Sequence, residues 1–217
     1  MFCNKNKINW DDFDGLRETV KSLVKEKRYI HTLGVELEAV KLAEIFELKD
    51  ENFIKKIKSA AILHDITKEF NKKTQLEICR EYNFKLTYED KKAEKPIHAK
   101  TAAYVAKFEF GADDVIFSAV YNHTLGGSFD APIADKIIYL ADYIEPNRAY
   151  QDCVDVREYF YAKINNAKNL NDKFKILDET MLFSCNITIK ALIEDNLFIH
   201  KNTIKYRNSF IKEKVMV

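Results

Sequence analysis

Apolar residues recur along most of this chain at spacings of three and four, the spacing that places them on one face of an α-helix. In segment 52–64, for example, Ile57, Ala60 and Ala61 occupy positions i, i+3 and i+4. No repeat, low-complexity tract or Gly/Ser/Pro linker separates the periodic segments, so we expect an all-α chain with one main domain. The pattern predicts a terminal segment from Leu197 and helices at about 13–29, 31–48, 52–64, 75–82, 96–111, 113–123, 133–144, 155–167 and 172–195.

Residues that begin or end helices mark two of these segments near the middle of the chain. Pro96 fits the first turn of a helix, where its missing N–H costs nothing, and Gly111 fits the position just after a helix. Asp113 places a carboxylate at the positive end of the next helix dipole. These signals put His98 in the first turn of one helix and His123 at the end of the next.

Composition narrows the functional classes. The chain has 217 residues, with 35 Lys+Arg against 34 Asp+Glu, and its hydrophobic fraction of 47% suits a folded core. A formal net charge of +1 lacks the basic field of a nucleic-acid-binding protein, so we expect no nucleic-acid partner. The 5 glycines cannot form a GxGxxG or GxxxxGK[ST] motif, which excludes a dinucleotide fingerprint and a Walker loop. With only 3 prolines, the chain has few helix breakers.

The cysteines and the N-terminal segment predict a cytoplasmic protein. Cys3, Cys79, Cys153 and Cys185 are far apart and form no CxxC pair, so neither a zinc knuckle nor a redox pair is expected. Such thiols fit a reducing compartment, where they are buried or idle. Segment 1–9 is polar, and no apolar run approaches the roughly 20 residues that span a bilayer, so we expect no membrane partner.

Several histidines and acids fall where an apolar residue is expected. His64, His123 and Asp142 each continue the apolar face of a predicted helix, and Asp65 lies directly beside His64. Taken singly, a buried histidine is more often a satisfied core residue, and a single inward aspartate is more often a helix cap. An unpaired buried carboxylate costs several kcal/mol, however, so these acids need a cation or good hydrogen-bond donors.

Taken together, these residues favour a metal site. The histidines and acids lie on or beside five predicted helices that could converge: His31, His64, His98, His123, Asp65 and Asp142. Two imidazoles and two carboxylates form a mixed N/O ligand set that suits iron, manganese or another divalent ion with open positions for water and substrate. A closed structural zinc site would require thiolates, and the cysteines lie elsewhere.

The same residues resemble a known signature. His31, the doublet His64-Asp65 in AAILHDITK and Asp142 in IIYLADYIEPNR resemble the H…HD…D pattern of the HD-domain metal-dependent phosphohydrolases. Longer stretches follow the order of one branch, the YqeK-type symmetrical bis(5′-nucleosyl)-tetraphosphatases: HDITK, IHAKTAAYVAKFEFG, NHTLGG, DKIIYLADYIEPNR, VREY and IHKNTIKYRN. The resemblance covers roughly residues 20–210. It implies a single HD-domain helical bundle with extra C-terminal helices over 20–217, and an N-terminal extension over 1–19 that precedes it or packs on it.

The resemblance also implies a metal centre. His31, His64, Asp65 and Asp142 would hold one metal ion, an iron, with manganese or another divalent ion as alternatives. Asp65 is in addition the candidate base, because it is the carboxylate nearest a water on that ion. His98 and His123 complete the implied catalytic set; contact with phosphate is favoured over a second ion, since no spare acid is visible beside them.

Phosphate contacts are implied at further positions. Lys68 lies one helical turn from Asp65 and offers a point charge, and Arg148 of the EPNR motif offers a planar fork for bidentate binding. Without the motif, Lys68 would be a solvated lysine and Arg148 part of a surface salt bridge. The implied substrate-binding set is His31, Asp65, Thr67, Lys68, His98, His123, Thr124, Asp142 and Arg148.

Two features are expected to be structurally ordinary. His200 has no acidic or histidine neighbour in the sequence, which predicts a surface residue. The Lys/Glu-rich segment 88–95 predicts a solvated connection. The aromatic residues are mostly at helical spacing and are expected in the core.

The resemblance implies an enzyme that cleaves diadenosine tetraphosphate symmetrically to two ADP, and a homodimer. One alternative is another HD-type nucleotide phosphohydrolase, a nucleotidase or deoxynucleotide phosphohydrolase, which the NHTLGG and EPNR motifs disfavour. The other is a non-catalytic ADP-binding regulatory module, which the complete ligand set disfavours.

Overall fold

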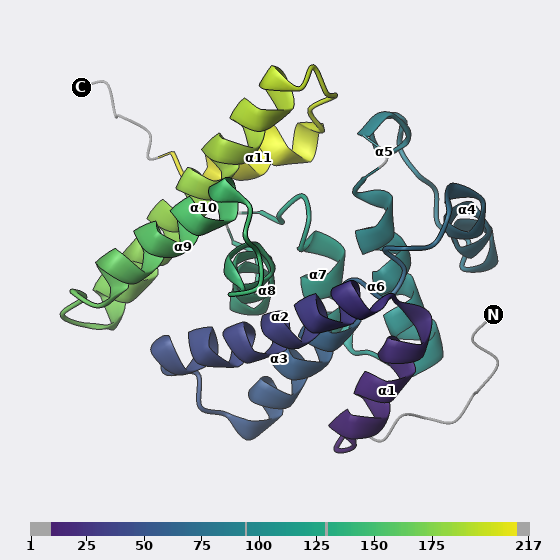
Figure 1. Ribbon diagram of the computed structural model, residues 1–217, viewed down its shortest axis with the longest axis horizontal. Coiled ribbons are helices and arrows are strands. Elements are labelled where there is room, and N and C mark those ends of the chain that lie inside the picture. The colour runs from purple at the N-terminus through teal and green to yellow at the C-terminus, as the bar shows by residue number, and fades with distance from the viewer. Residues whose placement is uncertain (1–9, 94, 129, 212–217) are drawn as a thin grey trace.

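The computed structural model describes residues 10–93, 95–128 and 130–211, and within these ranges the chain is helical with no strand (Figure 1). This confirms the expected all-α fold. The helices are α1 (Phe13–Leu23), α2 (Glu26–Ile45), α3 (Glu51–Leu63), α4 (Lys72–Glu81), α5 (Tyr88–Ala93), α6 (Ile97–Phe110), α7 (Asp114–Asn122), α8 (Ile133–Ile144), α9 (Gln151–Ile164), α10 (Leu170–Glu194) and α11 (Lys201–Ser209).

Local signals explain several helix ends. Asp50 and Asp113 cap α3 and α7, because their carboxylates accept hydrogen bonds from backbone N–H groups of the first turns. Pro96 immediately precedes α6, and Gly111 ends it in the left-handed region at φ 70°. Glycine reaches that region without the steric cost that a side chain would add.

The predicted break between the first two helices is in the wrong place. The periodicity predicts one helix over 13–29, whereas α1 ends at Leu23 and α2 begins at Glu26. Val24 and Lys25 between them are extended, and the N–H of Lys25 donates to the carboxylate of Glu69. Because Glu69 is 44 residues away in the sequence, no local pattern indicates this break.

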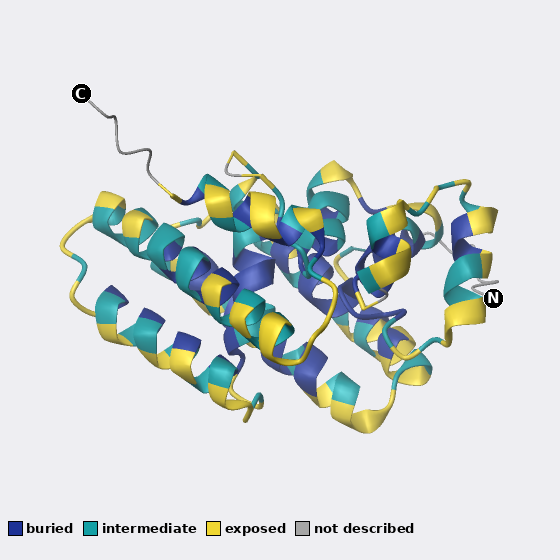
Figure 2. Ribbon diagram, turned by 90° about the horizontal axis from the view of Figure 1, so that it is seen from above, coloured by how far each residue is buried: buried dark blue, intermediate teal, exposed yellow. Residues whose placement is uncertain are grey.

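The core lies where α2, α3, α6, α7 and α8 pack together, and buried residues concentrate on these central helices (Figure 2). The helices α9 and α10 form an antiparallel pair, with α9 against α8 and α11 against α10 (Figure 1). These are the expected extra C-terminal helices. Leu16 and Val20 of α1 are buried in the same core, so the predicted domain boundary at residue 20 falls inside a helix and stays a prediction.

Two further expectations are wrong. The segment 88–95 is not merely a solvated connection, since it contains α5, whose Asp90 is fully buried and lies 2.7 Å from Lys100 Nζ. His200 is not a surface residue: it is 3% exposed, and its Nε2 lies 3.2 Å from Asp90 Oδ1. Its Nδ1 accepts from the backbone of Asn202 at the start of α11. Asp90 and His200 are 110 residues apart, which hides their pairing from the sequence.

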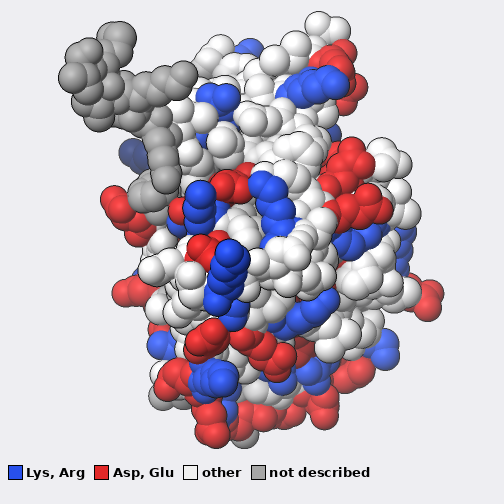
Figure 3. Space-filling model, turned by 90° about the vertical axis from the view of Figure 1, so that its left-hand side faces the viewer, with Lys and Arg blue, Asp and Glu red and all other residues white. Residues whose placement is uncertain are grey.

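The remaining expectations concern cysteines, membranes and charge. Cys79, Cys153 and Cys185 are buried with free thiols, as predicted, and Cys3 lies outside the described residues. In the described part of the chain, no helix has both the length and the apolar composition that crossing a membrane requires. On the face at the left of Figure 1, acidic and basic side chains are interspersed, and neither sign of charge covers this face alone (Figure 3).

Candidate active site

The four side chains that the sequence analysis assigns to one metal ion lie together. His31 comes from α2, His64 follows the last residue of α3, Asp65 comes next, and Asp142 lies near the end of α8. His31 Nε2 is 3.0 Å from Asp142 Oδ1 and 3.8 Å from Asp65 Oδ2. His64 Nε2 is 3.4 Å from Asp65 Oδ2 and 3.8 Å from Asp142 Oδ1. The fold therefore brings two imidazoles and two carboxylates to one point.

Three buried atoms in this cluster lack a hydrogen-bond partner: His31 Nε2, His64 Nε2 and Asp65 Oδ1. The Nδ1 of His64 lies 2.6 Å from the carbonyl oxygen of Ala61, and the Nδ1 of His31 lies 3.1 Å from Glu145 Oε1. If each Nδ1 donates, each Nε2 presents a lone pair to the cluster. Buried lone pairs that face carboxylates are unfavourable without a cation between them. The residues present thus fit a divalent metal ion with N/O ligands.

Electrostatics favour the protonation states that a metal needs at three of the four proposed ligands. At the fourth, His31, burial lowers the pKa, but hydrogen bonds to Asp142 and Glu145 outweigh it and raise the pKa above its ordinary value. Burial raises the pKa of Asp65, but the neighbouring His64 imidazole and the Lys68 ammonium outweigh it and hold that pKa well below its usual range. Burial likewise raises the pKa of Asp142, and Arg148 lowers it well below the usual range. Burial lowers the pKa of His64. Both aspartates are therefore anionic and His64 is neutral at physiological pH, as metal binding requires.

His98 and His123 meet at the other oxygen of Asp65. His98 Nε2 lies 3.1 Å and His123 Nε2 3.5 Å from Asp65 Oδ1, and the two Nε2 atoms are 3.1 Å apart. Burial, together with the charge of Lys68, lowers the pKa of His98 to about 4, so its imidazole is neutral at physiological pH. Asp65 therefore stands between two histidine pairs, one on each of its oxygens.

Two of the predicted phosphate-binding groups reach this second pair, and one does not. Lys68 Nζ donates to His98 Nε2 at 2.9 Å, and the Thr124 hydroxyl lies 3.3 Å from the same nitrogen. The Thr67 hydroxyl instead donates to the backbone carbonyl of His98 at 2.9 Å. The Thr67 side chain thus supports the start of α6, and its substrate contact stays a prediction.

Arg148 contacts the metal cluster through Asp142. Its Nη1 lies 2.6 Å from the Asp142 carbonyl oxygen and 3.0 Å from Asp142 Oδ1. Arg157, from the VREY motif, donates to the carbonyl oxygens of Ile144, Glu145 and Arg148 at 2.6, 2.6 and 2.8 Å. A cation that binds the last carbonyls of a helix complements the negative end of its dipole. Arg157 therefore holds the end of α8, where Asp142 and Arg148 lie.

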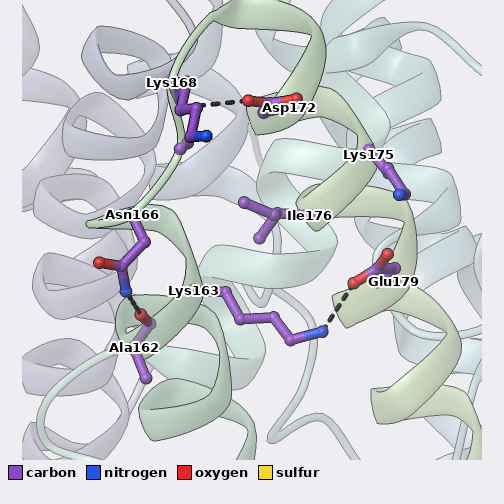
Figure 4. A pocket seen from close by; sticks show the side chains of 9 residues that line it. Ala162, Lys163, Asn166, Lys168, Asp172, Lys175, Ile176 and Glu179 are labelled. Carbon is purple, nitrogen blue, oxygen red and sulfur yellow. Dashed lines mark hydrogen bonds and ion pairs between the residues drawn. The ribbon is translucent and has the colours of Figure 1, made fainter.

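A separate hollow of about 350 Å³ lies between α9 and α10 and contains none of these residues (Figure 4). Its charged side chains are largely paired with one another or with the backbone: Lys163 lies 2.7 Å from Glu179, and the N–H of Lys168 donates to Asp172 at 3.1 Å. No histidine lines it. This hollow therefore lacks the grouped histidines and aspartates of the His/Asp cluster.

Comparison with protein families decides the class of this site. The family model "HD domain" matches residues 28–147, more than half of the chain, and that range contains all four proposed metal ligands. The chain belongs to the HD domain family. HD domains bind divalent metals and act as phosphohydrolases, in agreement with the mixed ligand set.

Individual relatives of this HD protein share most of its length. A protein of Bacillus subtilis named symmetrical bis(5′-nucleosyl)-tetraphosphatase is 37% identical over 68% of this chain and 77% of its own. A protein of the same name from Halalkalibacterium halodurans is 30% identical over 91% of this chain and 96% of its own. A crystal structure from Clostridium acetobutylicum, of a protein described as a "predicted HD superfamily hydrolase involved in NAD metabolism", has a TM-score of 0.78 and 31% identity. It covers 91% of this chain and 96% of its own.

The HD site also contains residues that the sequence analysis missed. Glu145 accepts from His31 Nδ1, and Asn147 in turn donates to Glu145 at 2.9 Å. A side chain at Gly34, one turn after His31, would overlap the Glu145 carboxylate. Arg28, one turn before His31, lies 2.7 Å from Asp65 Oδ2. The sequence held one signal for Arg28 and Gly34. They lie three residues before and three residues after His31, and residues at this spacing share one face of a helix.

Proposed function

We propose that this HD protein hydrolyses diadenosine tetraphosphate symmetrically to two ADP, using a metal ion held by His31, His64, Asp65 and Asp142. The observation that carries the proposal is the set of buried, unpartnered ligand atoms with cationic side chains beside them. The names of the relatives, which share most of the chain, support the substrate. Iron is the proposed metal, and manganese or another divalent ion would meet the same ligand requirements.

The chemistry that a bound metal supplies is a lowered pKa of a bound water and neutralisation of phosphoryl charge. Asp65 is the proposed base, accepting a proton from the attacking water. The water oxygen bonds to one of the two central phosphorus atoms while the bridging P–O bond between them breaks. One ADP keeps the new oxygen, and the other leaves with the bridging oxygen.

The protein's cationic and polar side chains are proposed to set the position of the cut. Lys68 and Thr124 lie beside His98, while Arg148 lies beside Asp142. Together with His98 and His123, they would hold one ADP half by its two phosphates and stabilise charge that grows in the transition state. A site that holds a diphosphate next to the metal presents the bond after the second phosphate, which is the midpoint of a four-phosphate chain.

A second cation at His98 and His123 is a further candidate, favoured by one observation. The sequence shows no spare acid there, but the structure supplies Asp65 Oδ1, which lies within 3.5 Å of both Nε2 atoms. The two roles of this pair differ in metal stoichiometry. Two metal ions bound per wild-type protein and one per His98→Ala protein would mean that His98 and His123 hold an ion. One metal ion in each would favour contact of the pair with phosphate.

The proposed function is tested by metal analysis of the purified protein and by chromatography of an early time point with diadenosine tetraphosphate. ADP as the only nucleotide product supports it, whereas ATP and AMP in equal amounts contradict it. A nucleotide panel tests the nucleotidase and deoxynucleotide phosphohydrolase alternatives. Turnover below about one per hour, against the typical 1–1000 per second of enzymes, would identify an ADP-binding regulatory module instead.

Two further properties are proposed, a cytoplasmic location and a homodimer. A cytoplasmic location is supported by the three buried free thiols, which suit a reducing compartment. The homodimer follows only from the resemblance, and light scattering of the purified protein tests it.

A further inference from the structure

Arg28 links the surface of the protein to the buried metal cluster. Its side chain is 26% exposed, yet its Nη1 lies 2.7 Å from Oδ2 of Asp65, whose side chain is only 2% exposed. Its Nε is buried without a hydrogen-bond partner. The Arg28 guanidinium thus binds the Asp65 carboxylate through Nη1, while its Nε donor has no acceptor.

The oxygen that Arg28 contacts is the one that faces His31 and His64. Asp65 Oδ2 lies 3.4 Å from His64 Nε2 and 3.8 Å from His31 Nε2, so an ion held by both histidines would take this oxygen. The guanidinium supplies positive charge at this oxygen in the structure. A divalent ion there would weaken the attraction of Arg28 to Asp65, because it neutralises the carboxylate and repels the guanidinium.

Arg28 is also one of three cations around the cluster. The side chains of Arg28, Lys68 and Arg148 are 26%, 34% and 28% exposed, so all three reach from the buried acids toward solvent. They contact only two acids in the cluster, Asp65 and Asp142. With a metal neutralising those acids, three like charges would converge without a counter-anion, an arrangement that suits a polyphosphate.

We infer that Arg28 is a phosphate-binding residue, which leaves Asp65 when metal binds and then contacts the substrate chain. Lys68 lies on the Oδ1 side of Asp65 and Arg28 on the Oδ2 side, so the two would bind phosphates on opposite sides of this carboxylate. The inference rests on the proposed function and adds a residue that the signature motifs do not include.

The test compares Arg28→Gln and Arg28→Lys with a matched control, Arg80→Gln, at an exposed arginine on α4. Metal affinity is measured by titration of the metal-free protein, and ADP and tripolyphosphate affinity by calorimetry of the metal-loaded protein. We expect Arg28→Gln to bind metal at least as tightly as the wild type, since a competing cation is gone. Its affinity for both phosphate ligands should fall on the order of 10- to 100-fold, with Arg28→Lys intermediate.

Weaker metal binding by Arg28→Gln with unchanged phosphate affinity would overturn the inference, because Arg28 would then only orient Asp65. Equal loss in Arg80→Gln would also overturn it, as a general charge effect. Thermal melting of each variant separates these results from misfolding, and Arg28→Lys retains the charge if the Gln variant is unstable. The tripolyphosphate measurement does not depend on which nucleotide the enzyme cleaves, so failure of the proposed function remains distinguishable.

Discussion

Three histidines of the site share one local geometry. The Nδ1 atoms of His64, His98 and His123 each lie within hydrogen-bond distance of the carbonyl oxygen three residues earlier. His64 and His123 follow the last residues of α3 and α7, where helix carbonyls have no intrahelical partner. Each such contact satisfies one carbonyl and points Nε2 at Asp65. A single hydrogen bond from Nδ1 to the backbone thus orients each ring, so that its Nε2 faces the place where a cation or a phosphate would bind.

At this scale, Asp142→Asn and His64→Ala should each lose bound metal and activity together. An amide or a methyl group cannot replace the carboxylate or the imidazole as a ligand. Metal content by mass spectrometry and turnover of diadenosine tetraphosphate check this. Either variant with stoichiometric metal and more than about a tenth of the activity would show that the ligand assignment is wrong.

Lys68→Ala should keep its metal and lose substrate affinity. Lys68 contacts His98 and lies 3.7 Å from Asp65 Oδ1, and a charge-assisted bond to phosphate is worth roughly 1.5–3 kcal/mol. We therefore expect kcat/KM to fall about 10- to 100-fold, with Lys73→Ala, at an exposed position, unchanged. Loss of metal from Lys68→Ala would argue against a phosphate-binding role.

At the scale of elements, the site depends on how α8 and the turn after α7 are held. The end of α8 carries Asp142, and Arg157 of α9 donates to the carbonyl oxygens of Ile144, Glu145 and Arg148. Across the site, Gly126 lies in the turn after His123 with φ 74°, and a Cβ there would overlap the ring of Tyr206 in α11. The C-terminal helices therefore support the segments that carry Asp142 and His123.

Gly126→Ala should destabilise the protein more than Gly111→Ala. Both glycines have positive φ, so each substitution costs about 1–2 kcal/mol of backbone strain. Gly111 has open space around its Cβ position, whereas Gly126 faces Tyr206, and overpacking adds about 1–3 kcal/mol. Urea unfolding of the two variants gives the difference. Equal free energies of unfolding would mean that α11 does not constrain this turn.

At the scale of the whole molecule, a buried polar cluster joins segments far apart in the chain. Asp90 of α5 contacts Lys100 of α6 and His200 at the start of α11. Lys100 lies two residues after His98, so this cluster connects the C-terminal helix with the helix that carries a site histidine. A second ion pair, between Lys201 Nζ of α11 and Glu89 Oε1 of α5 at 2.7 Å, lies beside it on the surface.

This cluster predicts a pH-dependent stability. Burial lowers the pKa of His200 from its ordinary 6.5, against the opposing charge of Asp90. Below pH 6.5 the unfolded chain therefore binds a proton that the folded protein does not, and stability falls as the pH drops. His200→Gln should lose less free energy of unfolding than the wild type between pH 7.5 and pH 5. Identical pH dependence in the two proteins would show that His200 does not titrate in this way.

Local sequence determined most of the helices and the chemical class of the site. The i, i+3, i+4 periodicity, the Asp113 cap and the Gly111 stop act within one or two turns, so they are readable without the fold. His64, His123 and Asp142 stood out because polar residues on apolar helix faces are costly unless they have a partner. The full set of proposed ligands, His31, His64, Asp65 and Asp142, came from the resemblance to the HD signature, and the structure brings these four side chains together.

Only the tertiary structure decided which distant groups become partners. Lys25, at the break between α1 and α2, contacts Glu69, and the buried His200 contacts Asp90, which no local pattern connects to it. The contacts of Glu145 with His31 and of Arg28 with Asp65 likewise join residues 114 and 37 positions apart. Such pairs form because packing of the apolar faces brings them together and removes water. The energy of a buried charge then depends on neighbours that the chain supplies only once it is folded.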